Sequence, residues 1–176
     1  MALSWSHTVL LVRDREKMLD FYTRVLGFDI TDQGPIPTGQ EIIFLSQSPE
    51  EHHQIGIMPA RTDDGPSNSH AHIAFRTESM DELRALLAAI EGEDISYRPT
   101  SHGNTWSIYF QDPEQNGVEI FCDTPWHVQQ PQGAVWDTKL DDDALQAWTL
   151  ETFKNQPGFT EKSSYVARRR KERASA

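Results

Sequence analysis

The sequence contains an internal repeat whose two copies lie 65 positions apart, and each copy begins with a histidine before an apolar run. His7 opens the first copy and His72 the second, and the same offset relates Gly27 to Gly92. Between each histidine and its glycine lies one segment with helical periodicity. Such a repeat predicts two similar modules that face a shared polar site, to which each module contributes a histidine.

The first module is expected to contain a strand, a helix and further strands. We predict the first strand at residues 7–12, followed by a helix that Asp14 caps and Gly27 ends. Further strands are predicted at residues 41–45 and 54–58, because apolar and β-branched residues fill both runs.

The second module repeats this order after a linker at residues 61–69, which is rich in Asp, Gly, Pro, Ser and Asn. Ser79 is expected to cap its helix, Glu82 to reach back in a capping box, and Gly92 to end the helix. Strands are predicted at residues 71–75, 106–111 and 118–122. Each module then reads β-α-β-β-β. The predicted class is α+β: two tandem βαβββ modules forming a curved mixed sheet around a metal site, plus a helical C-terminal extension.

The composition changes after Trp126, where a run rich in Pro and Gln begins. We therefore predict one domain at residues 1–126, with modules at about 4–60 and 70–126, and an extension at 127–176. The extension is expected to hold a linker and a helix that starts at the acidic residues 141–143. The basic run at residues 168–173 is interpreted as a solvated or frayed helix end.

The extension is expected either to cover the site or to mediate homo-oligomer contacts, with three tryptophans buried there. The alternative is that it only packs on its own module. The three tryptophans are Trp126, Trp136 and Trp148.

The net charge of −11 argues against nucleic acid or an anionic membrane as a partner. The single cysteine, Cys122, excludes an internal disulfide framework and is typical of a reducing compartment. No apolar run approaches the roughly 20 residues of a membrane span, and the first residues lack the features of a signal peptide. We expect a cytoplasmic protein.

Glu119 is an ionisable residue inside an otherwise apolar strand, between Val118 and Ile120. A hairpin turn centred near residue 114 would place Tyr109 opposite Glu119 on one face. The histidines that open the two copies would add two imidazoles to this carboxylate. Two histidines and one carboxylate with open positions form the facial arrangement that suits non-haem Fe(II).

Several stretches of the chain resemble the vicinal oxygen chelate superfamily, which includes glyoxalases, bleomycin-resistance proteins and extradiol dioxygenases. Within it, the chain is most similar to single-domain type I extradiol dioxygenases. The stretches are residues 6–10 with the Phe-Tyr-x-x-Val-Leu-Gly motif of 21–28, residues 52–57, residues 69–75, and residues 102–113 leading to Glu119. One departure is Gln115, which stands where the family usually has Gly or Pro, so we expect a different turn there.

The resemblance implies an Fe(II)-dependent dioxygenase that inserts both atoms of O₂ into a catechol-type diol during aromatic compound degradation. The implied metal ligands are His7, His72 and Glu119, with Mn(II) as the alternative metal. His53 is implied to be the base that deprotonates the catechol. His102 is implied to lie beside dioxygen, and Tyr109 to donate a hydrogen bond to a substrate oxygen.

Three of these assignments require a choice between neighbouring possibilities. The repeat selects His72 over His70, although strand alternation would put both on one face. His52 and His53 are expected to point in opposite directions, and the resemblance selects His53. His102 is expected on a loop or bulge, because a regular strand would turn it away from Tyr109.

Two other functions compete with ring cleavage. A glyoxalase-like isomerase or lyase usually needs a fourth protein ligand in this superfamily, and the 65-residue offset from Glu119 leads to Gln54. Residues 54–58 contain no carboxylate. The second alternative is a metal-free binding protein of the bleomycin-resistance kind, which has no need for metal ligands and proton-handling residues.

Overall fold

The computed structural model describes residues 3–66 and 69–175, and the chain divides into two compact units. Unit 1 comprises Met1–Ala71 with Gln111–Asn116, and unit 2 comprises His72–Phe110 with Gly117–Ala176. Positions 67 and 68 of the expected linker, the first two residues and the last one lie outside the described residues. The domain boundaries predicted from composition stay a prediction.

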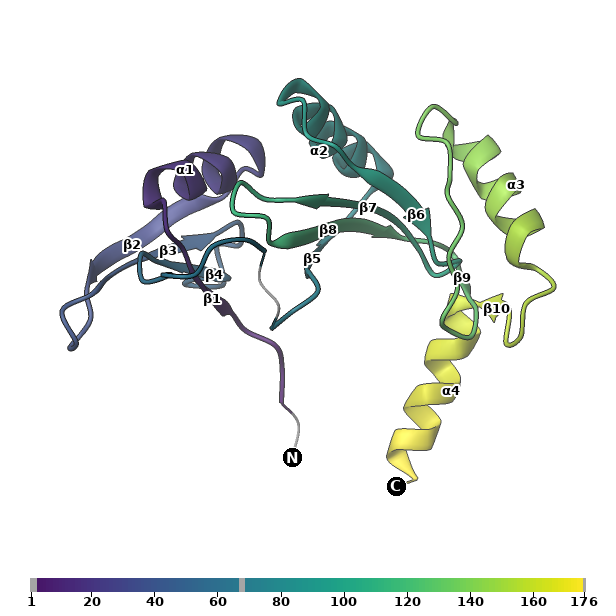
Figure 1. Ribbon diagram of the computed structural model, residues 1–176. Helices are drawn as coiled ribbons and strands as arrows, with labels where there is room; N and C mark the ends of the chain where they lie inside the picture. Colours follow the sequence, from purple (N-terminus) through teal and green to yellow (C-terminus); the bar gives the residue numbers. More distant parts are fainter. Residues whose placement is uncertain (1–2, 67–68, 176) are drawn as a thin grey trace. The chain divides into compact units, whose positions relative to one another are not determined.

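Unit 1 contains one mixed four-stranded sheet with the strand order β1-β4-β3-β2 (Figure 1). Strand β1 pairs with β4 in parallel, whereas β3 pairs with β2 and with β4 in antiparallel fashion. The elements are β1 (Thr8–Leu11), α1 (Arg15–Asp20), the π-helical turn η1 (Phe21–Val25), β2 (Asp29–Pro35), β3 (Glu41–Ser46) and β4 (Ile55–Met58).

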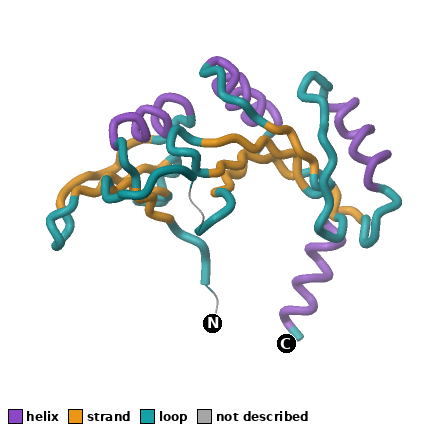
Figure 2. Tube along the Cα trace, viewed as in Figure 1, coloured by secondary structure: helices purple, strands orange, loops and turns teal. Residues whose placement is uncertain are grey.

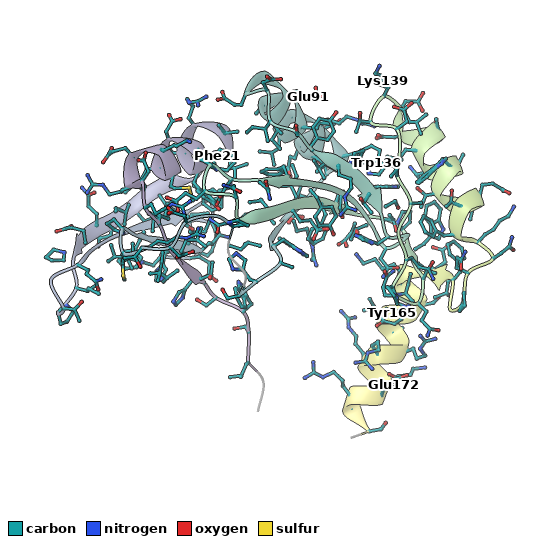
Figure 3. All side chains as sticks on the ribbon, in the orientation of Figure 1. Phe21, Glu91, Trp136, Lys139, Tyr165 and Glu172 are labelled. Carbon is teal, nitrogen blue, oxygen red and sulfur yellow. The ribbon has the colours of Figure 1, made fainter. Side chains whose placement is uncertain are left out.

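The helical segment α1–η1 lies on one face of this sheet, as Figure 1 shows. Asp14 caps it as predicted, since its side chain accepts a 3.0 Å hydrogen bond from the Lys17 N–H. Gly27 follows the helix with a φ of 77°, a backbone conformation that favours glycine. The buried side chains of the segment include Met18 and Phe21, the second of which is labelled in Figure 3.

The turn at residues 112–116 belongs to unit 1, and its carboxylates receive several hydrogen bonds. Asp112 accepts from the Tyr22 hydroxyl at 3.2 Å and from both the backbone and side-chain nitrogens of Asn116. Burial raises the pKa of Asp112, and these hydrogen bonds oppose that shift. Glu114 accepts from the backbone N–H of Arg13 at 2.6 Å. Gln115 has a φ of 66°, so the turn places a non-glycine residue in the left-handed region.

Unit 2 repeats this topology, with the strand order β5-β8-β7-β6 and a parallel pairing of β5 with β8. Figure 2 shows the strands of this sheet in orange, with helix α2 in purple beside them. The predicted βαβββ modules and the α+β class are therefore confirmed. The elements are β5 (Ile73–Thr77), α2 (Met80–Gly92), β6 (Arg98–Ser101), β7 (Thr105–Gln111) and β8 (Gly117–Asp123).

The ends of α2 differ in detail from the predicted capping. Ser79 accepts from the Glu82 N–H as expected, but the Glu82 carboxylate accepts from the Glu78 N–H at 2.8 Å. Gly92 is the last residue of the helix, and Asp94 adopts the left-handed conformation that ends the segment, with a φ of 56°. A short polar side chain tolerates this conformation better than most residues do.

Within residues 127–175 the extension contains two helices, whereas one was predicted. Helix α3 (Asp142–Phe153) begins after Asp141, whose side chain accepts from the Ala144 N–H at 2.8 Å. A two-stranded sheet of β9 (Trp126–His127) and β10 (Thr160–Glu161) leads into α4 (Lys162–Ala174). The basic run at residues 168–173, interpreted as a solvated or frayed helix end, forms the exposed last part of α4, which buries no side chain. No helix within the described ranges combines the length and apolar character that a bilayer crossing requires.

Only one of the three extension tryptophans is fully buried. Trp136, labelled in Figure 3, is 2% exposed and donates to the Ser107 carbonyl at 3.2 Å. Trp126 and Trp148 are half-buried, so the prediction of three buried tryptophans is wrong for these two. Each contacts a phenylalanine of the extension instead of entering a core.

Candidate active site

His72 and Glu119 meet on neighbouring strands of unit 2. Ala74 of β5 pairs with Glu119 of β8, and His72 lies two residues before Ala74, which places its side chain on the same face as Glu119. The His72 Nε2 atom is 3.0 Å from Glu119 Oε2. The Glu119 side chain is 9% exposed, whereas that of His72 is 39% exposed. An imidazole and a buried carboxylate thus converge at one accessible point.

Tyr109 of β7 lies beside this pair. Its ring stands edge-on to the His72 ring, with 5.4 Å between the centroids. Burial is the largest cause that raises the pKa of the Tyr109 phenol well above its ordinary value, and a hydrogen bond with Glu119 and the charge of that carboxylate add to it. The Tyr109 hydroxyl therefore stays protonated and acts as a hydrogen-bond donor.

His102 lies on the turn between β6 and β7, as the spacing to Tyr109 predicted. Gly103 follows it with a φ of 76°, which turns the chain back toward the sheet. The His102 Nε2 atom is 2.8 Å from the Tyr109 hydroxyl, and its Nδ1 atom is 2.6 Å from the Gln132 carbonyl oxygen. The contact with Gln132 was not foreseen, because a backbone carbonyl leaves no trace in the residue pattern.

His7 and His53 lie together in unit 1. His7 immediately precedes β1 and His53 lies two residues before β4, and the parallel pairing of Thr8 with Ile55 brings these strand ends side by side. The two rings are 4.2 Å apart between centroids. Burial lowers the pKa of His53, and the neighbouring His7 and His52 lower it further. His53 is therefore neutral near pH 7 and is able to accept a proton.

The prediction that His52 and His53 point in opposite directions is wrong. Their Nδ1 atoms are 2.9 Å apart, and both rings contact Phe44. Both residues lie on the irregular segment before β4, where the alternation of a strand does not apply. Phe44 was not singled out from the sequence, but strand alternation sets it apart from its buried neighbours Ile43 and Leu45.

The structure places His70 and His72 in different surroundings. His72 contacts Glu119, as described above. His70 belongs to unit 1, where it lines a cavity of about 460 Å³ together with Val9 and Leu11.

Within residues 3–66 and 69–175, no group of three or more His, Cys, Asp or Glu side chains is arranged to hold a metal ion. The pair formed by His72 and Glu119 supplies two donors at one point of unit 2. An imidazole nitrogen and a carboxylate oxygen are suitable ligands for Fe(II) and Mn(II). The donor set of this pair therefore fits the implied metal.

The strand register shows which residue of the first module corresponds to Glu119, and it differs from the Gln54 that the 65-residue offset indicated. Ala74 pairs with Glu119 in unit 2, and the repeat-related Val9 pairs with Gly56 in unit 1. The counterpart is therefore Gly56 and not Gln54, because the path between the paired strands is two residues longer in the first module. A Cβ atom at Gly56 would lie 3.1 Å from Val9 Cγ2, so this position is also closely packed.

Comparison with known proteins identifies the class. The sequence model of the Glyoxalase/Bleomycin resistance protein/Dioxygenase superfamily matches residues 4–120. The chain belongs to this superfamily, as its two βαβββ modules and the resemblance of its motifs predict.

Several individual relatives are named as dioxygenases of aromatic diols or triols. The chain is 28% identical to biphenyl-2,3-diol 1,2-dioxygenase 2 of Rhodococcus globerulus, in an alignment that covers 87% of this chain and 93% of the relative. It is 29% identical to the metapyrocatechase of Pseudomonas sp. (strain CF600), over 78% of this chain. The chain spans 45% of that second relative's length and 39% of a 2,2',3-trihydroxybiphenyl dioxygenase from Sphingomonas paucimobilis.

Solved structures share the fold at lower sequence identity. A glyoxylase/bleomycin resistance protein/dioxygenase domain from Frankia sp. EAN1pec superposes with a TM-score of 0.61 and 21% identity, covering 70% of this chain and all of that one. The fosfomycin resistance protein FosX from Listeria monocytogenes gives a TM-score of 0.56 and 22% identity, covering 70% of this chain and 96% of FosX. At these sequence identities the similarities support the fold alone.

Proposed function

We propose that this protein is an Fe(II)-dependent extradiol dioxygenase that cleaves the ring of a catechol-type diol. The observation that carries the proposal is the pairing of His72 with Glu119 at 3.0 Å, with the protonated Tyr109 beside it. Several relatives are named as dioxygenases of biphenyl-2,3-diol or catechol, which agrees with the proposal.

In this proposal, His72 and Glu119 supply two ligands and His7 supplies the third. Three protein ligands leave coordination positions open for a bidentate diol and for dioxygen. The chemistry that the ion supplies when bound is electron transfer between the diol and dioxygen. Everything else in the reaction falls to the side chains of this chain.

The side chains divide the proton handling among themselves. His53 is neutral near pH 7, so it takes a proton from a diol hydroxyl. Tyr109 keeps its own proton and donates a hydrogen bond to a substrate oxygen. His102 contacts the Tyr109 hydroxyl through Nε2, which provides a proton carrier next to that donor.

The position of Gly56 favours ring cleavage over the isomerase alternative. A glyoxalase-like isomerase would need a fourth protein ligand, and the counterpart of Glu119 in the first module is a glycine in contact distance of Val9. A metal-free binding protein would have no use for the neutral His53 or for the contact between His102 and Tyr109.

Anaerobic reconstitution with Fe(II) tests the proposal. The loaded protein is mixed in air with catechol or biphenyl-2,3-diol, and a yellow ring-cleavage product is expected. Parallel samples contain Mn(II) in place of Fe(II), or the hemithioacetal of methylglyoxal and glutathione in place of the diol. Turnover of the hemithioacetal without any yellow product would overturn the proposal in favour of the isomerase. Diol binding with neither product would overturn it in favour of the binding protein.

We also propose that the chain forms a homo-oligomer, as expected from the sequence. Trp148 of the extension and Trp126, which directly precedes the extension, are half-buried and keep apolar surface accessible. Light scattering after size-exclusion chromatography measures the mass in solution. A monomeric mass at micromolar concentration would contradict this proposal.

A further inference from the structure

The first part of the extension is attached to the edge of the unit 2 sheet next to His102. Ser101, the last residue of β6, exchanges two backbone hydrogen bonds with Ala134, at 2.8 and 2.9 Å. Trp136 then anchors the segment, because its buried indole donates to the Ser107 carbonyl. We call residues 128–136 the strap. The strap holds a fixed position beside the turn that carries His102.

One side chain of the strap ties His102 to Gln132. The Gln130 Nε2 atom donates to the His102 carbonyl at 2.8 Å, and the Gln130 Oε1 atom accepts from the Gln132 N–H at 2.9 Å. The same turn is also fixed by Asn104, whose side chain accepts from the Val128 N–H at 2.6 Å. Residues on both sides of His102 are therefore hydrogen-bonded to the extension.

The Gln132 carbonyl oxygen lies 2.6 Å from His102 Nδ1. A carbonyl oxygen only accepts hydrogen bonds, so Nδ1 must carry the hydrogen. In the opposite tautomer, a nitrogen lone pair would face the oxygen at this distance, and two acceptors would repel each other. In the neutral imidazole Nε2 is then an acceptor, and the Tyr109 hydroxyl lies within hydrogen-bond distance of it at 2.8 Å.

We propose that the strap is part of the active site, where it holds His102 in the tautomer with hydrogen on Nδ1. Gln130 is the positioning residue, since its side chain joins His102 to the segment that presents the Gln132 carbonyl. The catalytic meaning of this inference rests on the proposed function.

The tautomer decides the direction of the hydrogen bond between His102 and Tyr109. With Nε2 unprotonated, the single phenol hydrogen of Tyr109 has two acceptors, His102 Nε2 and the Glu119 carboxylate. When His102 gains a second proton, Nε2 becomes a donor and the phenol hydrogen is left to Glu119 or a substrate oxygen. Protonation of His102 therefore removes the imidazole as an acceptor and leaves Tyr109 as a donor to the substrate side of the site.

Nitrogen NMR on the full metal-free chain tests the tautomer directly. Long-range proton–nitrogen spectra distinguish protonated from unprotonated ring nitrogens, and the signals of His102 are identified by their loss in His102→Gln. In the neutral imidazole of His102, we expect a protonated Nδ1 and an unprotonated Nε2. A hydrogen on Nε2 in the unsubstituted chain would overturn the inference without the need for any strap variant.

The variant Gln130→Ala tests the positioning role. We expect its His102 to become a mixture of the two tautomers, because the Gln132 carbonyl is no longer held against Nδ1. The matched control is Gln129→Ala, which removes an exposed glutamine side chain one residue earlier and should leave the His102 signals unchanged. Identical His102 spectra in Gln130→Ala and the unsubstituted chain would overturn the role of Gln130.

Kinetics on the iron-loaded protein give the second readout. A mixture of tautomers leaves part of the molecules in the productive state, so kcat of Gln130→Ala should fall about two- to fivefold, with KM for the diol and iron content unchanged. A fall in iron content with the same kcat per iron would overturn the positioning role. Absence of ring cleavage in the unsubstituted protein would refute the proposed function. It would not affect the NMR measurement of the His102 tautomer, so failure of the proposed function and failure of this inference can be distinguished.

Discussion

The Nε2 atom of His72 lies 3.0 Å from the Oε2 atom of Glu119, although the two residues are distant in sequence. The parallel pairing of β5 with β8 creates this contact, since it sets Ala74 opposite Glu119. The strand register determines this contact, because a shift of one residue would move Glu119 to the other face of the sheet. Two proposed ligands are thereby positioned by the backbone of unit 2.

Glu119→Gln and His72→Ala should each lose most of the bound iron and reduce ring cleavage by about 10³-fold or more, because each removes one of the three proposed ligands. His7→Ala should behave in the same way. Iron is measured after anaerobic reconstitution and desalting, and His70→Ala is the control that should retain iron. Normal iron binding and ring cleavage in His7→Ala would show that the ligand assignment is wrong.

Tyr109→Phe should retain iron but lower kcat about 10- to 100-fold, because it removes a hydrogen bond and leaves the ligands in place. The raised pKa of Tyr109 also has a consequence for stability. The unfolded chain has the ordinary tyrosine value of 10.0, so the neutral phenol contributes stability below that pH and loses it as pH rises toward the higher folded pKa.

Ultraviolet titration of the folded protein checks this shift. Tyr109→Phe should not remove any phenolate that forms near pH 10, since Tyr109 is still protonated there. A phenolate signal near pH 10 that disappears in Tyr109→Phe would contradict the buried, hydrogen-bonded state of this side chain.

The lowered pKa of His53 should appear in the acid limb of the kcat/KM profile. Burial and the neighbouring His7 and His52 disfavour the imidazolium. The midpoint of the acid limb should therefore lie at a pH below the ordinary histidine pKa of 6.5. His53→Gln should abolish this limb and reduce kcat/KM about 10²-fold. His52→Ala removes a like-charged neighbour, so it should move the limb toward higher pH. A limb that does not move in His52→Ala would exclude His53 as the titrating base.

The same shift links His53 to stability. Because its folded pKa lies below the unfolded value, the unfolded chain binds more protons in the interval between them. Stability should therefore decrease as pH falls through 6.5, and His53→Gln should make this decrease smaller. Urea midpoints measured at several pH values between 5 and 8 test the expectation.

Gly103→Ala should destabilise the protein by about 2–5 kcal/mol, because it combines left-handed backbone strain with a steric clash. A Cβ atom there would lie 2.5 Å from Val128 Cγ1 and 3.1 Å from Phe153 Cγ. The matched control is Gly39→Ala, which has a φ of 85° but no heavy atom within 4 Å of the added Cβ. It should cost only about 1–2 kcal/mol. Equal losses in urea unfolding would show that the extension does not press against the His102 turn.

The sequence by itself determined the features that depend on local interactions and on repetition. The 65-residue offset predicted two modules of the same order, and the caps at Asp14 and Ser79 were predicted because a capping side chain bonds to a backbone group three residues away. The spacing between His102 and Tyr109 predicted a turn, and glycine at position 103 provides it. Such signals are readable because their partners lie within a few residues or recur at a constant distance.

Only the tertiary structure decided where side chains meet across the chain. It replaced Gln54 with Gly56 as the counterpart of Glu119, since strand register depends on connection lengths that differ between the modules. It brought His52 and His53 onto the same phenylalanine, because an irregular segment has no fixed alternation. It also placed the Gln132 carbonyl on His102, a contact made by the backbone, whose hydrogen-bonding groups are nearly the same in every residue and are located by folding alone.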